Sequence, residues 1–84
     1  MKRRKTLAKV LARSRNVRFE DALALAEGFG FRVARIAGSC HILARPDIPE
    51  LLNLQAVGGC AKPYQLKQLL DLVERYNLTL EDEQ

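Results

Sequence analysis

The single histidine of the chain, His41, is the side chain best suited to proton-transfer chemistry. It follows Gly38 and Ser39, a pair typical of a tight turn, and it opens a run of apolar residues. Histidine ordinarily has a pKa near 6.5, so both protonation states are available at neutral pH. Such a side chain can take the proton of a ribose 2′-hydroxyl or protonate the departing 5′-oxygen in RNA cleavage, a contribution of typically ~10²–10⁴-fold. Because no second histidine is present, Arg45, Lys62 or backbone N–H groups of the turn would have to stabilise the charge developing on the phosphate.

Other chemistries for this region fit the residues less well. Zinc bound by Cys40, His41 and Cys60 is disfavoured, because adjacent strand residues point to opposite faces and leave too few ligands on one side. A Cys40–His41 nucleophilic pair is disfavoured for the same reason, and both cysteines are expected to be free thiols. The pair Gly58-Gly59 lacks the Gly-x-x-x-x-Gly-Lys context of a phosphate-binding loop. We therefore expect no metal and no small-molecule cofactor.

The composition predicts one small soluble domain. The chain has 84 residues, of which 48% are hydrophobic, and at this size folding removes only about 60% of the unfolded surface from water. No apolar run approaches the roughly 20 residues that span a bilayer, and the basic start is not followed by the apolar core of a signal peptide. We expect a cytoplasmic protein without a membrane partner.

Charge is distributed unevenly along the chain, whose net charge is +4. Residues 1–18 hold eight cationic side chains and no acid, whereas residues 71–84 hold five of the ten acids. This asymmetry favours a polyanionic partner, most simply nucleic acid. The basic segment also predicts a short helix over residues 6–14, with Thr6 as its cap. Three interpretations of that helix stay open: a solvated helix packed on the domain, a nucleic-acid-binding arm, and a helix lying on a membrane surface.

The elements that must position His41 are predicted from hydrophobic periodicity and turn residues. Apolar residues recur at helical spacing in two segments, and three runs between them have the composition or alternation of strands. Proline at positions 46 and 49 closes the second strand, because proline donates no ladder hydrogen bond. The predicted elements are a helix from residue 19 to the glycines at 28 and 30, strands over 31–36, 40–45 and 52–56, a loop over 57–62, and a helix over 63–76 that ends at Asn77.

This order predicts an α+β two-layer sandwich. Its three-stranded antiparallel sheet is covered on one face by two helices, with an extra short N-terminal helix. If Ile42 faces the helices, alternation places His41 on the open face with Arg45, with the amides of Asn53 and Gln55 from the third strand, and with Arg32 as a further candidate from the first. Leu43 then also lies on the open face, which suits it poorly. One irregular residue near the glycine turn would shift the register and turn every side chain over.

Six parts of the chain together match the pattern of a known family: Ala26–Phe31, Gly38–Ile42, Arg45-Pro46, Leu52–Gln55, Ala61–Gln65 and the proline-started last helix. They resemble the HicA family of bacterial mRNA interferase toxins. The resemblance covers about residues 17–78 and leaves a basic extension at 1–16 and an acidic tail at 79–84. It implies a fold like the double-stranded RNA-binding domain, ribosome-independent mRNA cleavage by His41, and neutralisation by a HicB-type antitoxin. Cys60 departs from the family pattern, which often has a basic residue there.

We therefore expect the toxin of a type II toxin–antitoxin system, an RNA endonuclease with one catalytic histidine, His41. The alternative from another class is a non-catalytic RNA-binding module of the same fold, which binds duplex RNA by shape. A third interpretation is an interaction domain whose basic leader docks on an acidic protein. The residues expected to contact RNA are Arg32, Gly38, Ser39, Arg45 and Lys62.

Overall fold

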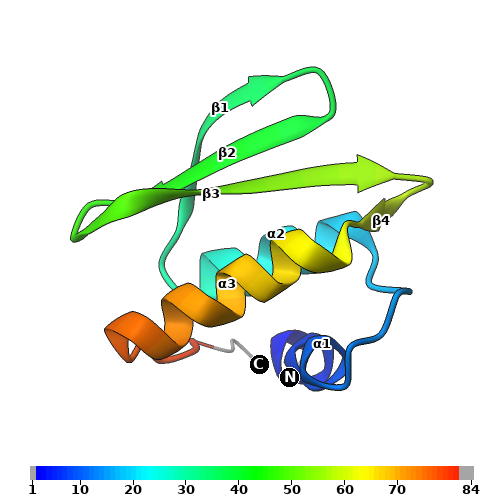
Figure 1. Ribbon diagram of the computed structural model, residues 1–84, viewed down its shortest axis with the longest axis horizontal. Helices are drawn as coiled ribbons and strands as arrows, with labels where there is room; N and C mark the ends of the chain where they lie inside the picture. The colour runs from blue at the N-terminus through cyan, green and yellow to red at the C-terminus, as the bar shows by residue number, and fades with distance from the viewer. Residues whose placement is uncertain (1, 82–84) are drawn as a thin grey trace.

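A four-stranded antiparallel sheet is covered on one face by two helices, α2 and α3, in the computed structural model, which describes residues 2–81 (Figure 1). The strand order follows the chain, β1-β2-β3-β4. The helix α1 lies on the far side of α2 and α3 from the sheet. The elements are α1 Lys2–Leu11, α2 Phe19–Gly28, β1 Arg32–Ala37, β2 Cys40–Arg45, β3 Ile48–Val57, β4 Cys60–Ala61 and α3 Pro63–Tyr76.

The α+β two-layer arrangement is confirmed, but the predicted number of strands is wrong. The segment predicted as a loop contains a fourth short strand, in which Cys60 pairs with Val57 and Ala61 with Ala56. Gly58 and Gly59 both have positive φ values, 59° and 81°. Two consecutive positive φ values are the requirement of a type I′ turn, which joins antiparallel strands directly.

The third strand begins four residues earlier than predicted. Ile48 pairs with Arg45, so β3 includes Pro49 and the chain turns only over residues 46–47. Proline is tolerated at this position because β4 pairs only with the other end of β3. On the β4 side, no neighbouring strand therefore needs a backbone N–H from Pro49. The predicted end of β2 at Arg45 is confirmed.

The two principal helices match their predictions. The chain leaves α2 through Gly30, whose φ of 95° is a value that glycine adopts at low energetic cost. Pro63 occupies the start of α3, and the helix ends at Asn77, which has the left-handed values φ 52° and ψ 49°. A left-handed residue at this position allows the last carbonyls to be hydrogen-bonded by following amides, here from Leu78 to Val73.

The N-terminal helix differs from its prediction in extent and in the role of Thr6. It spans Lys2–Leu11, and Thr6 lies inside it as a buried residue instead of capping its start. Val10 belongs to the hydrophobic core at 4% exposure, so α1 is packed on the domain, as the first of the three interpretations expected.

The core lies between the sheet and the two helices. Its largest fully buried side chains come from every layer: Val17, Leu25, Phe31, Leu43, Leu52, Leu54 and Leu69. Glu81, expected in a frayed tail, donates its amide to the Gly28 carbonyl at 2.8 Å, and residues 82–84 of that predicted tail lie outside the described range. Within residues 2–81, no helix has the length and apolar character needed to cross a membrane.

Candidate active site

His41 lies on the face of the sheet that the helices cover, so the predicted orientation of this strand is wrong. In the β2–β3 ladder His41 pairs with Leu54 and Leu43 pairs with Leu52. Directly paired residues of antiparallel strands share a face, and the three leucines are 0% exposed. Ile42 instead pairs with Asn53 on the open face. Burial of the leucines therefore determines the orientation and brings His41 inward with them.

The imidazole of His41 is half-buried at the edge of the core. It meets the ring of Phe19, the first residue of α2, in an edge-to-face contact with 4.9 Å between the centroids. Its Nδ1 is buried without a hydrogen-bond partner, the one such side-chain nitrogen or oxygen in the part of the chain described. Leaving a buried polar atom unpaired costs about 1–3 kcal/mol. Few buried polar atoms in folded proteins lack a hydrogen-bond partner, and a catalytic role is one explanation for such an atom.

The starts of α2 and α3 lie next to each other at the end of the sheet where β2 begins (Figure 1), and His41 is the second residue of β2. The amide of Phe19 donates to the Gly59 carbonyl at 2.9 Å, and the amide of Ala61 donates to the Val17 carbonyl at 2.9 Å. Lys62 follows β4 directly and is the N-cap residue of α3. The chain leading into α2 is thus joined to β4, and β4 leads into α3. Both helix starts therefore lie at the end of the sheet that carries His41.

Of the two helix starts, that of α3 has the electrostatic character of an anion site. Neither N-cap residue, Arg18 of α2 or Lys62 of α3, forms a side-chain capping hydrogen bond within residues 2–81. The first turn of α2 contains Glu20 and Asp21, and its Phe19 amide donates to Gly59, whereas the first turn of α3 contains no acid. Pro63 has no N–H, so the attraction of α3 for a phosphate comes mainly from its helix dipole and from Lys62.

The two cations at these helix starts differ in availability. Arg18 donates from Nε to a Glu20 carboxylate oxygen at 2.8 Å, and this hydrogen bond raises the pKa of Arg18 and lowers the pKa of Glu20. Lys62 has no carboxylate partner among residues 2–81, and its Nζ lies 5.8 Å from the centroid of the Tyr64 ring. Lys62 is therefore the cation more open to a phosphate.

The predicted turn that presents His41 is present and is fastened to β3. Gly38 has φ 60°, and Gly38 and Ser39 form the two-residue connection between β1 and β2. A positive φ at the first of two central residues is the requirement of a type II′ turn. The Ser39 hydroxyl accepts a hydrogen bond from Gln55 Nε2 at 3.2 Å. The turn is thus held in place two residues before His41.

Arg32 and Arg45, expected to hold phosphates beside His41, lie at the opposite end of the sheet. Arg45 Nη1 donates to the Phe29 carbonyl at 2.6 Å, and its Nε pairs with Asp47 at 2.8 Å. Arg45 lies four positions after His41 along the strand, roughly 13 Å at about 3.3 Å per residue. The two arginines therefore sit by the end of α2, with their donors turned to backbone carbonyls there.

Arg32 Nη1 likewise donates to the Phe31 carbonyl at 2.9 Å. The structure brings Lys62, Gly38 and Ser39 to the His41 end of the sheet and leaves the two arginines apart from it.

Phe19 and Tyr64 were missed as members of the site. No local pattern could have found them, because each reads as an ordinary helix residue and the contact joins distant parts of the chain.

Comparison with known proteins gives no match. Neither a protein-family model, nor a curated protein, nor a solved structure is matched by the chain. The resemblance to the HicA family therefore depends on the sequence segments alone. The chemistry of the site has to carry the functional inference.

The site combines a proton-transfer group with features that attract an anion. His41 is a side chain of the general acid–base type, while Lys62 and the positive end of the α3 dipole favour a phosphate nearby. Stabilisation of developing negative charge by positioned donors is a large contribution in phosphate chemistry. This combination suits cleavage of a phosphodiester by an internal hydroxyl, a reaction that needs proton transfer and charge stabilisation but no bound metal.

Proposed function

We propose that this protein is an RNA endonuclease similar to the HicA toxins, with His41 as its proton-transfer residue. The observation that carries the proposal is the half-buried imidazole beside two uncapped helix starts, whose Nδ1 has no partner in the described part of the chain. Folding alone would favour an apolar side chain at this position, because the unpaired nitrogen is costly. A catalytic role accounts for a histidine there.

In the proposed reaction the ribose 2′-oxygen attacks the adjacent phosphorus. The P–O bond to the 5′-oxygen of the next nucleotide breaks, which leaves a 2′,3′-cyclic phosphate on one fragment and a 5′-hydroxyl on the other. His41 takes the 2′-hydroxyl proton or supplies the proton of the leaving oxygen, and solvent supplies the complementary transfer. Lys62 and the positive end of the α3 dipole stabilise the charge on the non-bridging oxygens.

The RNA backbone in this proposal follows the end of the sheet that holds the glycine turn. Lys62, Gly38 and Ser39 contact the phosphate at the reacting centre, while Arg32 and Arg45 can contribute only at distant phosphates. Phosphate contacts carry affinity without sequence information, and each adds about −0.7 to the slope of log affinity against log salt for a single strand. The proposal also includes a HicB-type antitoxin as protein partner in the cytoplasm, supported by the family resemblance.

The test is incubation of the purified protein with an end-labelled single-stranded RNA in the presence of EDTA. We expect cleavage with 2′,3′-cyclic phosphate ends by the wild type and by Asn53→Ala, which removes an exposed polar group from the open face of the sheet. His41→Ala should lose cleavage while it keeps the circular dichroism spectrum of the wild type. Equal cleavage by His41→Ala would overturn the assignment. RNA that is bound but intact with every variant would instead identify a non-catalytic RNA-binding module.

A further inference from the structure

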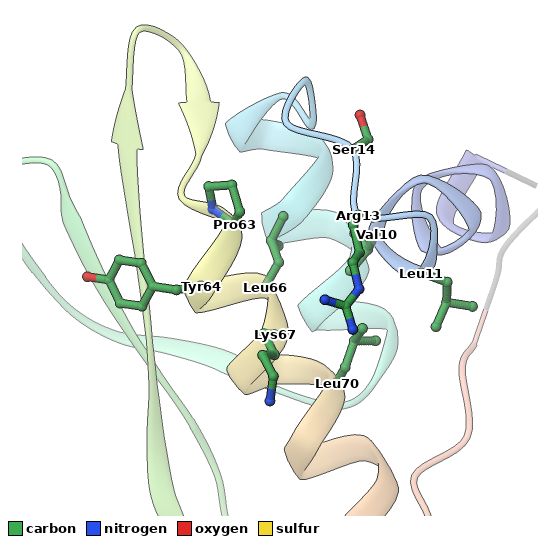
Figure 2. A pocket seen from close by; sticks show the side chains of 9 residues that line it. All are labelled: Val10, Leu11, Arg13, Ser14, Pro63, Tyr64, Leu66, Lys67 and Leu70. Carbon is green, nitrogen blue, oxygen red and sulfur yellow. The ribbon is translucent and has the colours of Figure 1, made fainter.

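A pocket of about 380 Å³ opens between the end of α1 and the first two turns of α3 (Figure 2). Its floor is apolar, because Val10 and Leu66 line it at 4% and 2% exposure. One large apolar side chain remains accessible at its margin, Leu11 at 61% exposure, whereas the ring of Tyr64 points away from α1 (Figure 2). Exposed apolar side chains gathered around a hollow are typical of a surface that binds another molecule.

Arg13 contributes a cation to this pocket from an unusual backbone position. Its φ is 61°, in the left-handed region, and its amide donates to the Val10 carbonyl while the Ser14 amide donates to the Lys9 carbonyl. These are the two hydrogen bonds of a Schellman motif, whose left-handed position is usually glycine. A side chain there strains the backbone. An arginine at this position is therefore explained better by what its side chain does than by the end of the helix.

The side chain of Arg13 reaches from the end of α1 across the pocket toward Leu70 and Lys67 of α3 (Figure 2). Within residues 2–81 it has no carboxylate partner. Lys67, the second cation of the lining, pairs with Asp71 at 3.1 Å. No acidic residue of the described chain lines the pocket itself. The Arg13 guanidinium is thus an uncompensated charge beside an apolar hollow.

A second pocket shares Leu11 and Leu70 with the first, and Asp71 and Glu74 belong to its lining. Since Asp71 is paired with Lys67, the groove formed by the two pockets has the cation Arg13 at one end and the acid Glu74 at the other. A segment lying along the groove would be oriented by these charges.

We propose that this groove binds an acidic amphipathic helix of another protein, with its apolar side chains in the pocket and its acidic end over Arg13. A groove between two helices suits a third helix that inserts apolar side chains at regular spacing. RNA fits less well, because its phosphates would leave the apolar floor uncovered. A second copy of this chain related by twofold symmetry would bring two Arg13 guanidinium groups to the same interface. The proposal is independent of RNA cleavage.

The probe is a pair of synthetic peptides of about 16 residues, long enough to form a stabilised helix. Both carry leucines at helical spacing. The remaining positions of one half are glutamate in one peptide and lysine in the other, and those of the other half are glutamine in both. Each is titrated into the full-length ¹⁵N-labelled protein. We expect the glutamate peptide to shift the amide signals of residues 10–14 and 64–70, with binding that weakens at high salt. The lysine peptide should bind at least about tenfold more weakly, because like charges meet at Arg13.

Two substitutions separate the pocket from the fold. Arg13→Gly removes the cation and relieves the strain of the left-handed backbone, so it should raise the melting temperature of the protein. It should also weaken binding of the glutamate peptide by about three- to tenfold. Asn77→Gly is the matched control, because Asn77 is the other left-handed non-glycine residue of the described chain and does not line the pocket. It should leave peptide affinity unchanged. Leu11→Ala, at an exposed margin, should weaken binding by about tenfold.

The proposal is overturned if the glutamate peptide causes no shift at these amides up to millimolar concentration, or if the two peptides bind equally. Shifts of the same amides by a single-stranded RNA, without an effect of the peptide, would assign the pocket to nucleic acid. Concentration-dependent shifts of these amides without any ligand would assign it to self-association. Unchanged peptide affinity in Arg13→Gly would show that the Arg13 charge does not contribute to binding and would overturn the proposed placement of the acidic end.

Discussion

The imidazole of His41 meets the phenyl ring of Phe19 edge to face, with 4.9 Å between the centroids and 70° between the planes. The contact joins the second strand of the sheet to the first turn of α2. Edge-to-face packing fixes the orientation of the imidazole, and it does so in a position where Nδ1 finds no hydrogen-bond partner in the described chain. The same contact thus positions the ring for chemistry and leaves a destabilising atom in the fold.

Replacing His41 with leucine should separate stability from activity. His41→Leu removes the unpaired nitrogen and keeps an apolar contact with Phe19, so we expect the free energy of unfolding to rise by about 1 kcal/mol. RNA cleavage should be lost at the same time. Urea denaturation and the cleavage assay measure the two effects. A loss of stability greater than about 1 kcal/mol would show instead that the imidazole has a structural role.

Arg45 and Lys62 should respond in opposite ways to the same substitution. Arg45→Met removes the hydrogen bond to the Phe29 carbonyl, and we expect a loss of about 1–2 kcal/mol in stability with an unchanged salt dependence of RNA binding. Lys62→Met should change stability by less than about 0.5 kcal/mol and reduce the salt slope by about 0.7. Fluorescence anisotropy at several salt concentrations gives the slope. A reduced salt slope in Arg45→Met together with an unchanged slope in Lys62→Met would place the phosphate contact at Arg45.

Gln65 should be important for stability although it is polar. It is 5% exposed, and its Oε1 accepts the backbone amide of Gln55 at 2.7 Å. Gln65→Leu leaves that amide without its acceptor, so we expect a loss of about 1–3 kcal/mol, whereas Gln65→Glu keeps an acceptor oxygen. Gln68→Leu, an exposed position of the same helix, is the control and should have little effect. Equal urea midpoints for Gln65→Leu and Gln68→Leu would contradict this role.

The pH dependence of stability should report the link between β3 and the end of α3. Glu50 accepts the Tyr76 hydroxyl and an Arg75 N–H, each at 2.6 Å. The hydrogen bond from Tyr76 lowers the pKa of Glu50 below its ordinary 4.5, and the hydrogen bond to Glu50 raises the pKa of Tyr76 above its ordinary 10.0. The contribution of Glu50 is therefore fully present above pH 4.5 and is lost as the pH falls through its lowered pKa.

The contribution of Tyr76 is fully present below pH 10.0 and is lost as the pH rises through its raised pKa. Tyr76→Phe should consequently be less stable than the wild type between these two limits, and the difference should shrink toward either extreme. Thermal unfolding across the pH range measures it. A constant difference at all pH values would show that the hydroxyl contributes through packing alone.

The sequence by itself determined the elements that local chemistry controls. The end of β2 at Pro46, the start of α3 at Pro63 and its end at Asn77 follow from backbone restrictions that act within a few residues. The spacing of leucines in the last helix likewise places Leu66 and Leu69 on its buried face, although Gln65 and Leu72 complete that face and Leu70 and Val73 are only partly buried. The layer arrangement follows from these elements, because two amphipathic helices and an antiparallel sheet can bury their apolar surfaces together.

Only the tertiary structure decided which face of the sheet carries His41. Alternation shows that His41 and Leu43 share a face, but it does not say whether that face is inside, and the burial of Leu43 against Leu52 settles the question. The short strand β4 depends on pairing with β3, and the Phe19 contact depends on residues distant in the chain. Energies that arise only when distant segments meet leave no local pattern, which is why the histidine could be identified from the sequence but its surroundings could not.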